Sequence, residues 1–294
     1  MGHRTWFVIL SLVACRGPAE VAEVGEVQEA APSLPDATAP NVADTSPPSG
    51  DAVTTSLSSG VDTSTGALEP RRRLRIMEHR GPATSRILYR VVEPDDANES
   101  TPVVVALHGR GDTAVGFVGL ARRLELDARV IVTEAPLPFG NIGGRQWFDS
   151  TSAEATQQVR ARLDDLDALV VELAARYPGA GKPGLVGFSQ GAILGLMAAA
   201  ERPDRYRSVV ALSGRLMPGA AGLAGDGPAI LIVAGTKDGI IPQADSWAAA
   251  DTLTGLGRKV ERFSFQGAHS VPPSAVERVG RYFDRTLGSP KNTP

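Results

Sequence analysis

The segment Gly187-Phe188-Ser189-Gln190-Gly191 places a serine between two closely spaced glycines. It follows a short apolar run and opens a stretch of small residues that is typical of a helix. Glycines at these places permit a sharp turn between strand and helix, and such a turn lifts the serine hydroxyl clear of the backbone. The spacing predicts Ser189 as a nucleophile. The alternative is a glycine-rich turn with an idle serine.

A serine hydroxyl becomes an effective nucleophile when a base removes its proton, and histidine suits this role because its pKa lies near neutrality. In one recurring arrangement of such sites, the acid and then the histidine follow the serine along the chain. His269 is the only histidine after Ser189. It lies in a loop after an expected strand over residues 259–265. We therefore predict His269 as the base, with an ordinary surface-loop histidine as the alternative.

The acid that orients the histidine should lie between these two residues. Asp238 follows the C-terminal end of an expected strand over residues 229–234, whereas Asp204 and Asp226 precede strands and so lie at the opposite edge. The remaining carboxylates fall on expected helices or inside a strand (Glu201, Asp245, Asp251 and Glu261). This elimination predicts that Asp238 fixes the tautomer of His269. The alternative is a turn formed by Asp238-Gly239.

Acyl transfer also needs two backbone N–H groups aimed at the developing oxyanion. Gln190, the residue after the nucleophile, should supply one of them. The other should come from the glycine-rich segment 108–112, which follows an apolar strand over residues 103–107. By position we predict the Arg110 N–H, and we expect His108 to orient this loop rather than to transfer protons. The alternative is a simple glycine-rich turn.

Strands and helices alternate along the chain from residue 74 onward. This order predicts an α/β fold with a mostly parallel central sheet and helices on both faces, in which sites gather at the C-terminal ends of the strands. The expected strands cover residues 74–79, 87–92, 103–107, 129–133, 184–188, 208–212, 229–234 and 259–265. The expected helices cover residues 113–126, 153–177, 190–201, 243–256 and 273–287, with Thr113 as an N-cap.

From about residue 74 to 287 the chain resembles the phospholipase/carboxylesterase family of α/β hydrolases, which includes the acyl-protein thioesterases. Residues 107–112 resemble its oxyanion loop, residues 187–191 its nucleophile elbow, and residues 235–242 and 267–269 its acid and base segments. The resemblance implies the α/β-hydrolase fold and hydrolysis of esters or thioesters.

Trp147-Phe148-Asp149 matches a stretch that this family has near its active site. Trp147 and Phe148 are therefore candidates for the substrate pocket. A position in the core is an equal alternative for this aromatic pair.

The first residues are expected to direct export. Residues 1–14 form a short basic and then apolar segment, which is typical of a signal peptide and too short to span a bilayer as a helix. Leu12-Val13-Ala14-Cys15 resembles a bacterial lipobox, which implies cleavage before Cys15 and lipidation of that residue. We expect anchoring in the cell envelope, at the outer membrane or periplasmic face. The alternative is a plain signal peptide.

Residues 15–70 predict a disordered, acidic tether that follows the lipidated cysteine. This segment is rich in Ala, Pro, Ser and Thr, and Arg16 is its sole basic residue. It lacks the apolar content that would offset the entropy of ordering it. Residues 71–294 are expected to form the catalytic domain.

Composition excludes several other functions. The net charge of −3 argues against a dedicated nucleic-acid binder. One cysteine and four histidines leave little material for a metal cluster, and no metal or organic cofactor is expected. We predict a serine hydrolase that acts on small esters or thioesters. A serine peptidase of the same fold and a non-catalytic, surface-anchored binding lipoprotein are the alternatives.

Overall fold

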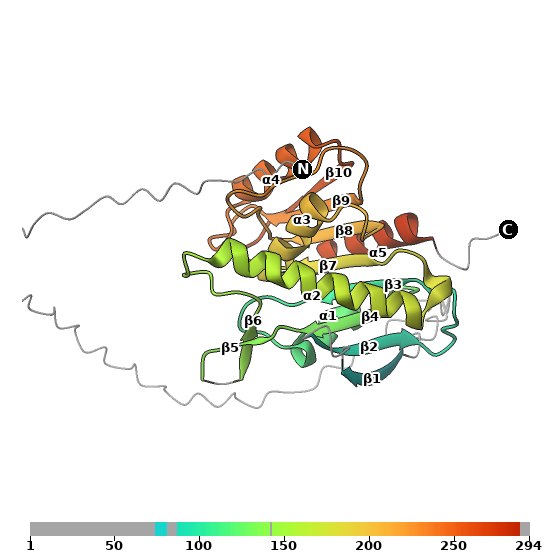
Figure 1. Cartoon of the computed structure of the whole chain (residues 1–294). Helices are drawn as coiled ribbons and strands as arrows, with labels where there is room; N and C mark the ends of the chain where they lie inside the picture. Colours follow the sequence, from blue (N-terminus) through green and yellow to red (C-terminus); the bar gives the residue numbers. More distant parts are fainter. Residues whose placement is uncertain (1–73, 81–86, 142, 289–294) are drawn as a thin grey trace, which may run out of the picture. The chain divides into compact units, whose positions relative to one another are not determined.

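A computed structural model of the chain describes residues 74–80, 87–141 and 143–288 (Figure 1). The predicted signal peptide and tether, with Cys15, lie outside the described residues. So do the first residues of the predicted catalytic domain, 71–73, and the last six residues of the chain.

An eight-stranded sheet forms the centre of the domain, in the order β1-β2-β4-β3-β7-β8-β9-β10. β1 and β2 form an antiparallel hairpin and β2 pairs antiparallel with β4, whereas all the other pairs are parallel. This arrangement confirms the predicted α/β fold with a mostly parallel sheet. The strands are β1 (Leu74–Arg80), β2 (Leu88–Pro94), β3 (Val103–Leu107), β4 (Arg129–Glu134), β7 (Gly184–Phe188), β8 (Ser208–Leu212), β9 (Ala229–Gly235) and β10 (Val260–Phe265).

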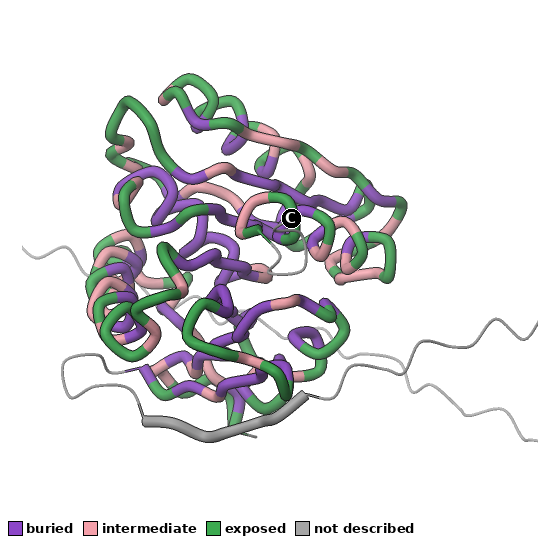
Figure 2. Tube along the Cα trace, turned by 90° about the vertical axis from the view of Figure 1, so that its right-hand side faces the viewer, coloured by how far each residue is buried: buried purple, intermediate pink, exposed green. Residues whose placement is uncertain are grey.

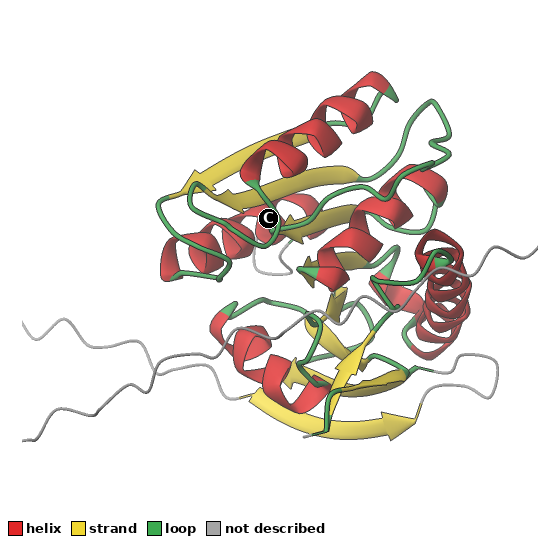
Figure 3. Ribbon diagram, turned by 90° about the vertical axis from the view of Figure 1, so that its left-hand side faces the viewer, coloured by secondary structure: helices red, strands yellow, loops and turns green. Residues whose placement is uncertain are grey.

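Helices cover both faces of this sheet (Figure 3). Side chains alternate between the two faces along β3, so Val105 and Leu107 join one apolar core while Val104 and Ala106 join the other. The first core includes residues of α2, α3 and α4, and the second includes residues of α1 and α5. The helices are α1 (Ala114–Arg123), α2 (Ala155–Arg176), α3 (Gln190–Glu201), α4 (Gln243–Gly255) and α5 (Pro273–Leu287).

The burial pattern explains the composition of the helices. All residues of α3 are buried, because this helix of small and apolar residues packs against the sheet. Figure 2 shows that buried residues fill the inside of the domain and exposed ones lie around its outside. α2 buries one apolar stripe at helical spacing, while Asp164 and Arg176 are exposed and its other charged residues are partly buried. Thr113 caps α1, since its hydroxyl accepts a hydrogen bond of 3.2 Å from the Gly116 N–H, as predicted.

A small hairpin beside the sheet was not predicted from the sequence. Its strands, β5 (Leu137–Phe139) and β6 (Gly144–Gln146), pair antiparallel. A short 3₁₀ turn, Pro178–Ala180, follows α2. None of the helices in the described part of the chain combines the length and the apolar character that crossing a membrane requires.

Candidate active site

Ser189 occupies a sharp turn between β7 and α3. Its φ of 54° and ψ of −114° lie in a region that side chains rarely adopt, and such strain costs about 1–3 kcal/mol. The turn is held by a hydrogen bond of 3.0 Å from the Ser189 N–H to the Leu212 carbonyl at the end of β8. The hydroxyl makes no capping bond to α3. It is therefore not engaged as a helix cap.

The two glycines of the elbow are required by close packing. A Cβ on Gly187 would overlap the Gly191 carbonyl oxygen, and a Cβ on Gly191 would overlap the carbonyl oxygen of Leu107 in β3. Strand, helix and the neighbouring strand therefore meet where no side chain fits.

Asp238 and His269 form a hydrogen-bonded pair at the same edge of the sheet. Asp238 follows β9, His269 follows β10, and His269 Nδ1 lies 2.8 Å from Asp238 Oδ2. A carboxylate can only accept, so the Nδ1–H donates and Nε2 is left free to accept a proton. The Asp238 side chain is fully buried, while the His269 side chain is 17% exposed. The Asp238 carboxylate is thus shielded from water, while the His269 ring is reachable from solvent.

Hydrogen bonds keep the buried Asp238 carboxylate ionised. Burial by itself would raise its pKa, but the N–H groups of Ile241 and Ile240 and the His269 ring outweigh burial and hold that pKa below its usual value. Both N–H groups donate to Oδ1 at 2.9 Å. Asp238 can therefore stabilise a positive charge on His269.

Contacts between rings and backbone bring Ser189 close to this pair. The ring of Phe188, the residue before Ser189, lies 4.8 Å from the His269 ring, measured between centroids. A Cβ on Gly109 would lie 3.1 Å from Phe188 and 3.4 Å from the Ser189 Cβ. The strand ends of β3, β7, β9 and β10 thus bring together the predicted residues of the site.

The loop after β3 is fixed by the buried ring of His108. The Ala135 N–H donates to Nε2 at 3.1 Å, so Nε2 has no proton, and Nδ1 must then donate to the Gly109 carbonyl at 2.7 Å. Burial lowers the pKa of His108, which keeps this neutral tautomer. With both ring nitrogens engaged, His108 is placed to orient the loop.

The backbone N–H groups of Arg110 and Gln190 are the predicted oxyanion donors. Arg110 precedes Ser189 in the sequence, and Gln190 follows it directly. Within the described part of the chain, neither backbone N–H donates a hydrogen bond. The Arg110 side chain points away to solvent, where it lies over the Phe139 ring at 5.2 Å and donates to Ser150 at 2.8 Å. Both N–H groups remain available to an acceptor.

A contact that sequence reasoning missed connects Gln190 to residues 147 and 148. The buried Gln190 amide accepts from the Trp147 N–H at 3.0 Å and donates to the Phe148 carbonyl at 2.9 Å. The Trp147 indole in turn donates to the His108 carbonyl at 2.8 Å. No feature of the sequence indicates this bridge between the elbow and the oxyanion loop.

Trp147 and Phe148 are themselves core residues. Their side chains are 0% and 1% exposed and belong to the larger apolar core. This is the position that the sequence analysis kept as the equal alternative to a substrate pocket. Their hydrogen bonds to the Gln190 amide and to the His108 carbonyl connect this part of the core to the predicted site.

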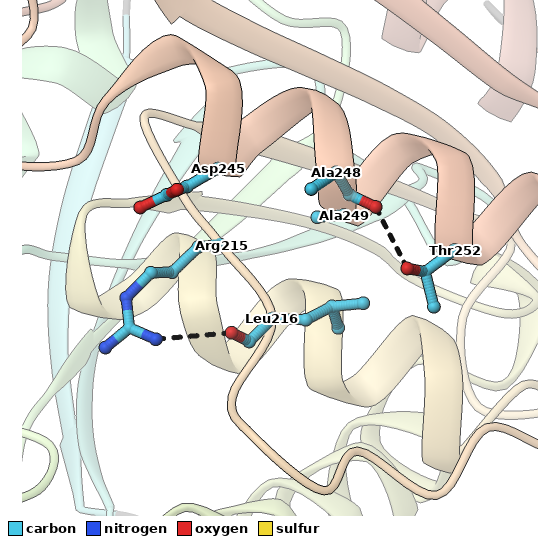
Figure 4. Close-up of a pocket in the computed structure, with 6 residues that line it drawn as sticks. All are labelled: Arg215, Leu216, Asp245, Ala248, Ala249 and Thr252. Atoms are coloured by element: carbon cyan, nitrogen blue, oxygen red, sulfur yellow. Dashed lines mark hydrogen bonds between the residues drawn. The ribbon is translucent and has the colours of Figure 1, made fainter.

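Hollows near this edge of the sheet include the following two. One cleft, of about 470 Å³, is lined by α1, Phe188 and the loop of His269. A second, of about 290 Å³, lies between α4 and the loop after β8, and its charged residues are Arg215 and Asp245 (Figure 4). The Arg215 guanidinium donates to the Leu216 carbonyl at 3.3 Å. No group of three or more His, Cys, Asp or Glu among the described residues is arranged to hold a metal ion.

Known proteins share this architecture, and some of them share part of the sequence. Esterase YpfH from Escherichia coli (strain K12) is 32% identical over 168 residues, which cover 54% of this chain and 71% of that esterase. Among solved structures, esterase PE8 matches with a TM-score of 0.57 at 25% identity, covering 64% of this chain and 93% of that one. A carboxylesterase from Mesorhizobium loti matches with a TM-score of 0.61, covering 70% and 99% of the two chains. Its identity of 20% shows a shared fold alone.

The family model of phospholipases and carboxylesterases matches residues 88–287. This stretch is more than half of the chain, and it contains the elbow, the oxyanion loop and the Asp238–His269 pair. The chain therefore belongs to the phospholipase/carboxylesterase family of α/β hydrolases.

Proposed function

We propose that this protein hydrolyses carboxylic esters or thioesters through an acyl-enzyme on Ser189. The observation that supports this most directly is the 2.8 Å hydrogen bond between Asp238 and His269, at the sheet edge where the strained elbow holds Ser189. Such a pair provides a base of fixed tautomer, which a serine nucleophile requires.

The first half of the reaction acylates the serine. Ser189 Oγ attacks the acyl carbonyl while His269 Nε2 takes the hydroxyl proton, and the Asp238 carboxylate stabilises the resulting imidazolium. The carbonyl oxygen becomes an oxyanion and accepts hydrogen bonds from the N–H groups of Arg110 and Gln190. Collapse of this intermediate breaks the bond to the alcohol or thiol, which leaves with the proton from His269.

Water completes the second half of the reaction. His269 takes a proton from a water molecule as its oxygen attacks the acyl-enzyme, and the oxyanion forms again at the same two N–H groups. Release of the carboxylic acid returns the proton to Ser189 Oγ. The fixed loop around His108 means that the oxyanion donors need little rearrangement during either half, which favours the transition state.

Kinetics and covalent labelling test this proposal together. We expect Ser189→Ala to lower kcat for p-nitrophenyl butyrate by several orders of magnitude and to abolish labelling by a fluorophosphonate probe. Ser274→Ala, which changes an exposed serine at the start of α5, is the matched control and should keep both. Retention of more than about a tenth of the rate in Ser189→Ala would refute the nucleophile.

A substrate panel separates the chemical classes. Esters from acetate to palmitate, acyl thioesters and peptides should be compared at equal enzyme concentration. We expect the esters or thioesters to be cleaved and the peptides to resist. Faster cleavage of peptides would replace this proposal with a serine peptidase, and no labelling or turnover at all would favour a binding protein.

We also propose that the mature protein begins at a lipidated Cys15 and is anchored in the cell envelope. The lipobox-like residues 12–15 support this. Two or three acyl chains hold a protein firmly because each buried methylene contributes about 0.8 kcal/mol. Mass spectrometry of the mature N-terminus should find an acylated Cys15, and Cys15→Ser should leave uncleaved precursor. An unmodified N-terminus at another residue would contradict the proposal.

A further inference from the structure

The cleft of about 470 Å³ extends from His269 along α1. Its α1 wall includes Gly116, Gly119 and Arg123, and its opposite wall includes Phe188 and His269. The three α1 residues are spaced by three and four positions, so they lie on one helix face. The rise from the first to the last is about 10 Å at 1.5 Å per residue. The cleft therefore follows the helix axis away from the candidate base.

The reacting end of the cleft is the N-terminal end of α1. Phe188 contacts the His269 ring, and it also lies against Gly109, three residues before Asp112. Asp112 immediately precedes the N-cap of α1 and also lines the cleft, whereas Arg123 is the last residue of the helix. A ligand that leaves His269 along this cleft would pass Asp112 first and end at Arg123.

Gly119 keeps the middle of the cleft open. A glycine inside a helix is less favourable than alanine, so it usually has a packing reason. Here a Cβ would have no other atom within 4 Å. Packing does not require the glycine, but a larger side chain at this position would extend into the space above the helix.

Arg123 places an unpaired positive charge at the far end. It is exposed, and among the described residues it has neither a hydrogen-bond acceptor nor an acidic partner. The negative charge of Asp112 lies at the other end of the same cleft. An anionic group is therefore disfavoured beside the reacting end and favoured at Arg123. A guanidinium binds a carboxylate or a phosphate through paired hydrogen bonds.

An ester could place either its acyl group or its leaving group in the cleft, and the proposed role of His269 decides between them. The base that takes the serine proton returns it to the leaving oxygen or sulfur, so the leaving group lies on the histidine side of the scissile bond. We infer that the cleft binds the leaving group and that Arg123 selects alcohols or thiols bearing a carboxylate or phosphate about one cleft length from the reacting atom. This inference rests on the function proposed above.

Matched butyrate esters test the charge preference. The leaving groups are hexanol, ω-hydroxyhexanoate and pentanediol monophosphate, which share five methylenes and differ only in the terminal group. In the native enzyme kcat/KM should be higher for the anionic esters than for hexyl butyrate. Arg123→Gln should lower that ratio by roughly fivefold, the size of one exposed ion pair. Arg122→Gln removes the same charge from a neighbouring exposed residue that does not line the cleft, and it should leave the ratio unchanged.

Salt and a steric variant give independent readouts. The preference for anionic esters should fade between about 0.01 M and 1 M salt, as the Debye length shortens from about 30 Å to 3 Å. Gly119→Leu replaces glycine by a better helix former and fills the cleft, so the kcat/KM ratio of hexyl to methyl butyrate should fall. The carboxylate and phosphate esters, compared with each other, show which anion the site prefers.

The two proposals fail in different ways. An unchanged anionic-to-hexyl ratio in Arg123→Gln, with Ser189→Ala inactive on methyl butyrate, overturns the cleft assignment alone. Equal loss in Arg122→Gln and Arg123→Gln overturns it too, because it shows a general effect of net charge. Activity of Ser189→Ala on methyl butyrate would instead overturn the proposed function.

Discussion

Replacing Asp238 by asparagine changes one side-chain oxygen to nitrogen, and the structure dictates which atom it will be. Oδ1 accepts N–H groups from Ile240 and Ile241, both at 2.9 Å, and Oδ2 accepts from His269 at 2.8 Å. The asparagine oxygen should stay on the two backbone groups. Turning the amide round would leave both N–H groups without an acceptor, at about 1–3 kcal/mol each.

The amide nitrogen then faces His269 Nδ1. Because that nitrogen donates, His269 must accept at Nδ1 and hold its proton on Nε2, the tautomer that cannot take a proton from Ser189. A wrong tautomer of this kind lowers kcat by about 10⁴ in a serine protease of another fold. That factor corresponds to about 5.4 kcal/mol of transition-state stabilisation. The loss should remain smaller than that of Ser189→Ala, which removes the nucleophile itself.

The assay is kcat for p-nitrophenyl butyrate, with Tm measured in parallel. Asp238→Asn keeps the shape of a fully buried side chain, so its Tm should stay near that of the native protein. Asp204→Asn removes an exposed carboxylate before β8, at the opposite edge of the sheet, and should leave kcat unchanged. A loss of less than about tenfold in Asp238→Asn would refute the assignment of Asp238, given the size expected for a tautomer error.

Three further predictions concern stability and the division of the chain. Burial lowers the pKa of His108, so the unfolded state binds more protons as the pH falls from about 6.5. The free energy of unfolding, measured by urea titration, should therefore decrease as the pH falls below this value. The decrease should be less steep in His108→Gln, which lacks this titrating group. The buried Arg258 guanidinium donates to the carbonyls of Ala199 and Leu223 at 3.0 and 2.6 Å. Arg258→Met should destabilise the fold by about 3 kcal/mol or more in chemical denaturation, since several buried carbonyls lose their donor, whereas the exposed Arg262→Met should change it little. A chain beginning at Arg71 should keep full activity on small esters, because residues 15–70 have too little apolar content to form a core; loss of activity would show that these residues contribute to the site.

The parts of the fold that follow from local pattern were predicted well. The bounds of β3, β7 and β8 match the expected strands, because each is a short buried apolar run between turn residues. The β5–β6 hairpin was missed, since its strands are three residues long and include Pro138 and Gly144. Contacts outside the hairpin hold it: the Gly111 N–H donates to the Arg145 carbonyl, and the Arg145 N–H donates to that of Asp112.

For the site, too, the features that follow from local sequence were predicted and those that depend on distant contacts were not. Residue type, order and strand ends were enough to select Asp238 from seven carboxylates, and the structure places it in contact with His269. The Gln190 amide bridge to Trp147 and Phe148 could not be predicted, because it joins residues more than 40 positions apart that only the folded core brings together. The open cleft along α1 likewise depends on the packing of a loop that follows β10.

The end of β9 shows how the sheet brings distant residues to one point. His269 follows β10, which lies three strands from β7 in the sheet, and strand spacing alone would separate their ends by about 14 Å. The loop after β10 must therefore cross the end of β9. A Cβ on Gly235, the last residue of β9, would lie only 2.5 Å from the Gly267 carbonyl oxygen, and the Lys237 N–H donates to that same oxygen at 2.9 Å. Glycine at this strand end lets the loop pass, so that the His269 ring reaches Phe188 while Asp238, which follows the strand being crossed, binds Nδ1 of the same ring.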